Sequence, residues 1–182
     1  IADVSHFVTP DSILDKAAYA RATSVYLPDR VNPMLPERIS NELCSLRPNE
    51  DKYTFSVIFQ ITNRAEIKHR WIGRTITHSD HRFTYEEAQE IIETGDGPHS
   101  KAITLLNSLA QQFRAERFRN GAINFSSTEV KFKLDEEGNP IGVTVKESKE
   151  AHKLVEEFML LANRAVAEYV SKIKINKEPV PF

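Results

Sequence analysis

The fold is decided by residues 53–77, which read YTFSVIFQITNRAEIKHRWIGRTIT. The alternate apolar positions of the first half are Tyr53, Phe55, Val57, Phe59 and Ile61. A period of two residues is typical of a strand with one buried face. The run TNRAE at 62–66 indicates a turn, after which residues 67–77 can return beside the first strand. The sequence therefore predicts a long antiparallel hairpin.

Helices are predicted both before and after this hairpin in the sequence. Thr84 can cap a helix that starts at Tyr85, because a hydroxyl accepts a bond from an unpaired N–H of the first turn, and Gly95 can end that helix. Apolar residues at helical spacing predict three further helices, over residues 13–23, 100–119 and 148–173.

Two more strand regions follow from the same alternation. Residues 130–134 and 141–145 flank the turn sequence DEEGNP and predict a second hairpin. Residues 1–7 carry spaced apolar side chains and predict an extended segment at the start of the chain.

The stretch 24–46, SVYLPDRVNPMLPERISNELCSL, carries three prolines among regularly spaced apolar residues. Proline has no N–H to donate and restricts the residue before it, which argues against a central strand or a long helix. We therefore predict an ordered loop, with a helical turn from Pro36 to Leu43.

These elements together predict the fold class. Strand hairpins interleaved with helices, without strict strand-helix alternation, favour an α+β fold of largely antiparallel sheet hairpins with packed helices. The chain has 182 residues and is 40% hydrophobic, which is enough for one core. We predict a single domain over residues 1–182.

Composition excludes several classes of protein. With 24 Lys+Arg and 26 Asp+Glu the formal net charge is −2, so an anionic partner must be held by a local patch, and cations concentrate in residues 67–78. The single cysteine, Cys44, excludes an internal disulfide and a cysteine-built zinc site, which favours a cytoplasmic protein. Neither a signal peptide nor a run of about 18 apolar residues is present, so we expect no membrane insertion.

Few residues suggest chemistry by themselves. His78, Asp80 and His81 in HSDH are metal-ligand types at close spacing, but the same residues also fit a solvated turn. Ser5 and His6 are adjacent on the expected strand and point to opposite faces, so they cannot form a nucleophile-base pair.

Two glutamates and three aromatic residues have two interpretations each. Glu156 and Glu157 interrupt a helical stretch, Leu154 to Ala162, that is apolar nearly all round, where a carboxylate either faces water or needs a buried donor. Tyr26, Tyr85 and Phe125 lie in loops or at element edges, where a ring either packs in the core or offers a stacking face to a base.

Four stretches of the sequence resemble one family. They are residues 1–46, RFTYEEA at 82–88, NGAINFSSTEVKF at 120–132 and AHKLVEEFMLLAN at 151–163. In order and spacing they resemble the RNB catalytic domain of the ribonuclease II and ribonuclease R family, and bacterial ribonuclease R more than ribonuclease II. The resemblance covers essentially the whole chain as part of that domain.

The resemblance implies a processive, hydrolytic 3′-to-5′ exoribonuclease that acts on single-stranded RNA, not DNA, and uses Mg²⁺ to release nucleoside 5′-monophosphates. It assigns the base-stacking positions to Tyr26 and Phe125. It also implies that Tyr85 and Glu156 distinguish ribose from deoxyribose, and a carboxylate suits a 2′-hydroxyl, which can donate to it.

The resemblance implies no catalytic or metal residue in this chain, because the family's aspartate cluster precedes the segment that begins at Ile1. We therefore expect an internal fragment of an exoribonuclease domain, inactive alone, that supplies RNA-channel and base-clamp residues. Exposed sheet edges would allow the fragment to dimerise. The alternative is a complete non-catalytic module that binds RNA or a protein.

Overall fold

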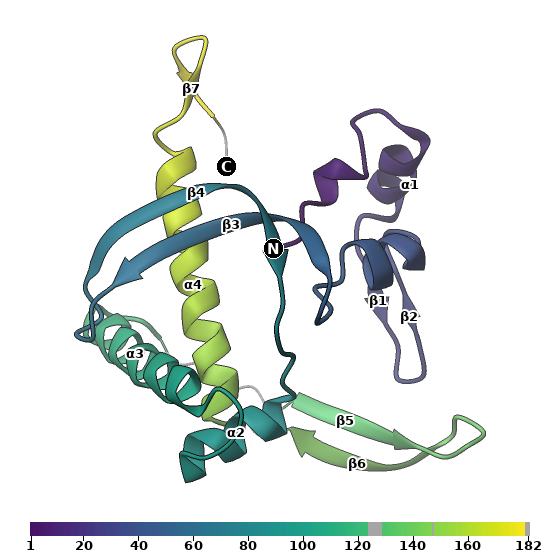
Figure 1. The fold of residues 1–182 in the computed structure, drawn as a ribbon. Helices are drawn as coiled ribbons and strands as arrows, with labels where there is room; N and C mark the ends of the chain where they lie inside the picture. Colours follow the sequence, from purple (N-terminus) through teal and green to yellow (C-terminus); the bar gives the residue numbers. More distant parts are fainter. Residues whose placement is uncertain (124–128, 147, 181–182) are drawn as a thin grey trace. The chain divides into compact units, whose positions relative to one another are not determined.

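The computed structural model describes residues 1–123, 129–146 and 148–180 (Figure 1). The chain divides into two compact units, which are described separately. Unit 1 contains residues 1–56, 74–82 and 126–147, and unit 2 contains residues 57–73, 83–125 and 148–182. That the whole chain forms one domain stays a prediction.

The predicted long hairpin is confirmed: β3 (Asp51–Ile61) pairs with β4 (Ile67–His78). Within unit 1, Thr54 is only 1% exposed. Its hydroxyl lies 2.7 Å from the Thr75 hydroxyl and 2.6 Å from that of Thr77. A buried hydroxyl is costly unless it is hydrogen-bonded, so these cross-strand contacts fix the register at this end of the hairpin.

Most cations of β4 lie beside a carboxylate. The pairs are Lys68–Glu66, Arg70–Glu168, Arg74–Asp3 and, when the histidine is protonated, His78–Asp51. The Arg70–Glu168 contact, at 2.6 Å, joins the hairpin to the last long helix within unit 2. The concentration of positive charge expected here is therefore largely neutralised by local ion pairs.

The prediction of an extended segment over residues 1–7 holds for residues 1–3, which pair with β3, and is wrong for residues 4–7. Ala2 makes an isolated bridge with Thr54, and the chain then forms a 3-10 helix, η1 (Val4–His6). The Ser5 hydroxyl donates to the Asp3 carboxylate at 2.5 Å, and the His6 N–H donates to the Asp3 carbonyl at 3.1 Å. Such local bonds from short polar side chains compete with strand pairing.

The proline-rich stretch is ordered, as predicted, but it also contains two short strands. After α1 (Ile13–Arg21), β1 (Val25–Tyr26) pairs with β2 (Val31–Asn32). The predicted helical turn is present as η2 (Arg38–Leu43), which has π-helical geometry. All three prolines lie outside the two strands, which agrees with their missing N–H donors.

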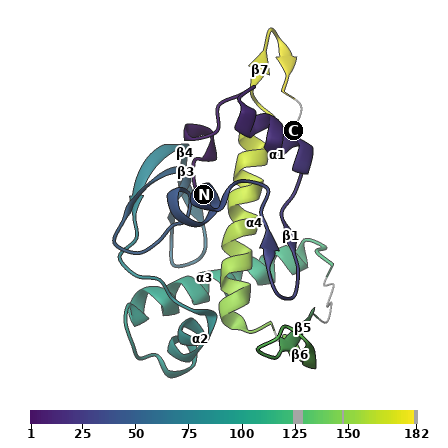
Figure 2. The same ribbon diagram turned by 90° about the vertical axis from the view of Figure 1, so that its right-hand side faces the viewer.

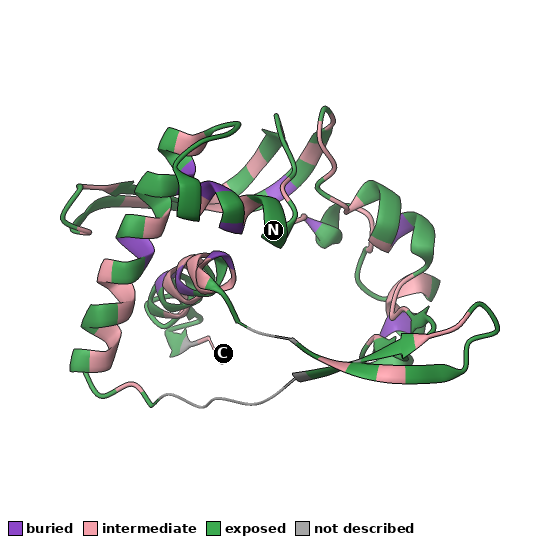
Figure 3. Ribbon diagram, turned by 90° about the horizontal axis from the view of Figure 1, so that it is seen from below, coloured by how far each residue is buried: buried purple, intermediate pink, exposed green. Residues whose placement is uncertain are grey.

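Three helices pack together in unit 2, and each was predicted (Figure 2). They are α2 (Tyr85–Thr94), α3 (Ser100–Arg119) and α4 (Glu150–Val170). Each of these helices carries buried residues (Figure 3), and they are Gln89 and Ile91 on α2, Ile103, Leu109 and Ala110 on α3, and Ala151, Glu157 and Ala165 on α4. The burial of a glutamine and a glutamate among these residues requires hydrogen-bond partners.

The second hairpin is also confirmed, since β5 (Glu129–Leu134) pairs antiparallel with β6 (Pro140–Lys146). The Asp135 carboxylate closes its turn by accepting the Asn139 N–H at 2.7 Å. That bond, with further backbone donors, lowers the pKa of Asp135 below its usual value. A third short pair, β7 (Lys174–Ile175) and β8 (Glu178–Pro179), was not predicted.

Helices and antiparallel hairpins together confirm the α+β class. In the part of the chain that the structure describes, no helix combines the length and apolar character needed to cross a membrane.

We predict that Thr84→Ala lowers the free energy of unfolding by about 1 kcal/mol, because Thr84 accepts the Glu87 N–H at 3.2 Å and so caps α2. Urea unfolding measures the change. Thr84→Ser keeps the hydroxyl and serves as the control. An alanine variant as stable as the serine variant would contradict the role of the cap.

Candidate nucleic-acid interface

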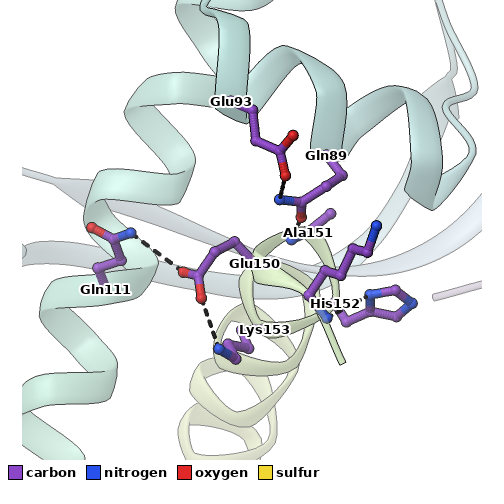
Figure 4. Close-up of polar contacts among 8 residues, drawn as sticks. Gln89, Glu93, Gln111, Glu150, Ala151, His152 and Lys153 are labelled. Carbon is purple, nitrogen blue, oxygen red and sulfur yellow. Dashed lines mark hydrogen bonds and ion pairs between the residues drawn. The ribbon is translucent and has the colours of Figure 1, made fainter. Parts of the chain in front are cut away.

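The first turn of α4 is bonded to α2 through a buried glutamine. Gln89 is 8% exposed, and its side-chain oxygen accepts the Ala151 N–H at 3.0 Å (Figure 4). Its side-chain nitrogen donates to Glu93 at 2.7 Å. The first N–H groups of a helix have no partner within the helix. Gln89 therefore satisfies one of them and fixes α2 against the start of α4.

Glu150, the first residue of α4, connects the same turn to α3. Its carboxylate accepts a bond from Lys153 at 2.7 Å and one from Gln111 of α3 at 3.3 Å (Figure 4). The Lys153 bond is the main cause that holds the pKa of Glu150 below its usual value. A carboxylate at this end of a helix is also favoured by the helix dipole.

Tyr85, the first residue of α2, stacks on His152 of α4. The ring centroids are 4.1 Å apart and the ring planes differ by 9°. His152 Nδ1 accepts the Lys149 N–H at 3.3 Å, so the proton of the neutral ring lies on Nε2. Tyr85 remains 44% exposed, which leaves part of its ring open to a ligand.

The two neighbouring glutamates of α4 have different environments. Glu157 is 3% exposed, and Arg117 of α3 bonds both of its oxygens, from Nη2 at 2.5 Å and from Nε at 3.2 Å. Glu156 is half exposed and lies 3.4 Å from Arg117 Nη2. Of the two interpretations drawn from the sequence, the buried carboxylate with a donor thus applies to Glu157 and the water-facing carboxylate to Glu156. The bond to Glu157 is the main cause that raises the pKa of Arg117.

The predicted RNA-binding residues lie in different parts of the molecule. Tyr85 and Glu156 both belong to the helical cluster of unit 2. Tyr26 lies in β1 of unit 1 and is 79% exposed, so its ring is available for stacking rather than buried in the core of that unit. Phe125 lies outside the residues that the structure describes.

Sequence reasoning missed His152, Arg117 and Gln89 as parts of this cluster. His152 lies four residues before Glu156, so helical spacing alone places the two on one side of α4. Its contact with Tyr85 joins residues that are far apart in the chain, so no short-range sequence pattern could have predicted it. The basic end of α3 was visible in the sequence, but its buried carboxylate partner was not.

The described residues do not offer a magnesium site. Among residues 1–123, 129–146 and 148–180, no group of three or more histidine, cysteine, aspartate or glutamate side chains could hold a metal ion. Asp3 is already engaged, because Ser5 bonds one oxygen and Arg74 Nε lies 3.1 Å from the other. The Ser5 bond is the main cause that lowers the pKa of Asp3. In HSDH, His78 bonds the Asp51 carboxylate at 2.7 Å.

A cavity of about 600 Å³ lies elsewhere in unit 2, between the turn of the β3–β4 hairpin and helices α3 and α4. Its charged lining includes the Arg70–Glu168 and Lys68–Glu66 pairs. Neither Tyr85 nor Glu156 lines it. The cavity is therefore separate from the candidate interface.

We predict that Arg117→Met destabilises the protein by about 3 kcal/mol, because it leaves the buried Glu157 carboxylate without its partner. The double variant Arg117→Met/Glu157→Leu should recover most of this loss, since no buried charge remains. Urea unfolding measures both. Arg119→Met, at an exposed residue of the same helix, is the control. Equal stability of Arg117→Met and Arg119→Met would refute the assignment.

Comparison with known proteins identifies the family of this chain. The sequence matches the RNB domain over residues 1–177. It is 45% identical to DIS3-like exonuclease 2 of Schizosaccharomyces pombe over 94% of this chain and 20% of the relative. It is 41% identical to ribonuclease R of Chlamydia pneumoniae over 94% of this chain and 25% of the relative. The chain therefore spans about a fifth to a quarter of the length of these relatives.

The fold agrees with the sequence match. The structure of Mycoplasma genitalium RNase R in complex with ribose-methylated single-stranded RNA matches with a TM-score of 0.87 and 30% sequence identity, over 93% of this chain and 27% of that one. The resemblance noted in the sequence is thus confirmed, and it extends beyond bacterial ribonuclease R to DIS3-like proteins. With residues 1–177 of 182 matched, the chain belongs to the RNB domain family.

Proposed function

We propose that this chain is part of a processive 3′-to-5′ exoribonuclease that hydrolyses single-stranded RNA to nucleoside 5′-monophosphates, and that it supplies part of the RNA channel. The observation that carries the proposal is the cluster around the start of α4, where a half-exposed tyrosine and a half-exposed glutamate occur together in an RNB chain. The names of the relatives and the RNA-bound neighbour support the same substrate class.

The exposed side chains suit RNA by their chemistry. Tyr26 and Tyr85 present ring faces on which bases can stack, and stacking tolerates any base because every base has a π-face. We assign the same stacking role to Phe125. The Glu156 carboxylate can accept a bond from a ribose 2′-hydroxyl, a group that DNA lacks.

Hydrolysis needs metal-holding groups that the described residues of this chain do not bring together. Phosphodiester hydrolysis assisted by Mg²⁺ requires carboxylates that hold the ion, and the described residues do not fit that role. We propose that other parts of the full-length protein hold Mg²⁺ and that the 182 residues alone do not hydrolyse RNA. The apolar residues Ile141, Val143 and Val145 of β6 are 69%, 61% and 63% exposed, which supports a larger domain that covers this hairpin.

Two further proposals complete this function. We propose that the full-length enzyme acts in the cytoplasm and that the isolated chain can dimerise through its exposed sheet edges. The second candidate function is a non-catalytic module that binds RNA or a protein. The half-exposed tyrosine and glutamate of the helical cluster fit that function as well, because both side chains can bind RNA or a protein that is not cleaved.

We expect the full-length protein with Mg²⁺ to release nucleoside 5′-monophosphates from the 3′ end of single-stranded RNA and to leave the matching DNA intact. Gel electrophoresis of 5′-labelled strands and chromatography of the products measure this. The 182-residue chain should leave RNA intact under the same conditions. RNA binding without hydrolysis by the full-length protein would favour the non-catalytic module, and cleavage by the short chain would refute the proposed division of roles.

We predict that Tyr26→Ala raises the dissociation constant of the full-length protein for single-stranded RNA by about tenfold at fixed salt, as expected for one lost base-stacking contact. Tyr26→Phe keeps the ring and should bind like the wild type. The matched control is Tyr19→Ala, which removes another exposed tyrosine of unit 1, 87% exposed. Equal affinities of the Tyr26→Ala and Tyr19→Ala variants would exclude the stacking role.

A further inference from the structure

The stacked pair of Tyr85 and His152 holds an otherwise half-exposed ring in one orientation. The two rings are nearly parallel, with centroids 4.1 Å apart. An exposed tyrosine loses rotamer freedom when it is ordered, and a flat partner offsets part of this cost. The orientation of Tyr85 therefore depends on where the imidazole of His152 lies.

The imidazole is itself fixed by the start of α4. Its Nδ1 accepts the Lys149 N–H at 3.3 Å, and the neighbouring Ala151 N–H is bonded to Gln89 at 3.0 Å (Figure 4). Tyr85 and Gln89 are four residues apart and share one face of α2. That face of α2 thus makes two contacts with α4, the Tyr85 stack on His152 and the Gln89 bond to Ala151. Together they fix the rotation of α2 about its own axis and its position along α4.

His152 also lies close to the second candidate ribose-reading residue along the helix. Glu156 follows it by four residues, one helical turn on the same side of α4. The ring that supports Tyr85 and the carboxylate of Glu156 are therefore carried by one rigid segment. A substitution of His152 can therefore disturb the orientation of Tyr85 while both Tyr85 and Glu156 remain in the chain.

We propose that His152 is a positioning residue for the discrimination of ribose from deoxyribose, acting by stacking under Tyr85. The inference rests on the proposed function, in which Tyr85 and Glu156 read the sugar. His152 acts through its flat ring and contributes no bond to the RNA. Its effect should then disappear when Tyr85 is absent.

The experiment compares variants of the full-length protein on two single-stranded substrates, an RNA and the same RNA with 2′-deoxyribose in its last nucleotides. The measured quantity is the ratio of kcat/KM for the two. His152→Asn keeps an acceptor but removes the ring, and its ratio should fall roughly threefold to tenfold, as expected for one lost aromatic pair. His152→Phe keeps a flat ring and should stay within about twofold of the wild type.

A double-mutant cycle separates this role from a general loss of structure. Adding His152→Asn to Tyr85→Ala should change the ratio no further, because the tyrosine that the imidazole supports is already gone. The control His69→Asn, at an exposed histidine of β4, should leave the ratio unchanged. Thermal unfolding of each variant shows whether it folds.

The outcomes distinguish the inference from the function on which it rests. A wild-type protein that degrades neither substrate, or both equally, would overturn the proposed function and this inference with it. A discriminating wild type with an unaffected His152→Asn variant would overturn the inference alone. The inference would also fail if His152→Phe lost as much discrimination as His152→Asn, or if the effects of Tyr85→Ala and His152→Asn were additive.

Discussion

The candidate interface depends on how the first N–H groups of α4 are satisfied. A helix begins with N–H groups that have no partner inside it, and burying them without acceptors is costly. Here the acceptors come from α2 and from α4 itself, as Gln89 bonds the Ala151 N–H and His152 bonds the Lys149 N–H. The requirement for acceptors thus brings α2, and with it Tyr85, to the turn that precedes Glu156.

The buried Glu157 imposes a second constraint on the same helix. A buried carboxylate is tolerated only with a close cationic partner, and Arg117 meets that need with two bonds. The same guanidinium lies 3.4 Å from Glu156, which remains half exposed. One arginine therefore joins α3 to α4 and places a positive charge beside the carboxylate that we assign to the ribose.

Local patterns account for the elements that the sequence predicted. The hairpin of β3 and β4 and the helices α2 and α3 have clear periods or caps, which depend only on neighbouring residues. Residues 4–7 were predicted wrongly because bonds between Asp3 and its neighbours override the apolar spacing. The strand pairs β1–β2 and β7–β8 have two residues in each strand, too few to show any alternation.

The candidate site was less predictable because its contacts are not local. Arg117 and Glu157 are 40 residues apart. Helical spacing could not decide which glutamate of α4 is buried, because the stretch from Leu154 to Ala162 is otherwise apolar all round. The family resemblance identified Tyr85 and Glu156 as related residues, but it gave no physical link between them. The stack on His152 provides that link, since one imidazole contacts the tyrosine and lies one helical turn from the glutamate. We therefore propose that recognition of the sugar is organised within this chain, while the metal-dependent step uses residues from elsewhere in the full-length protein.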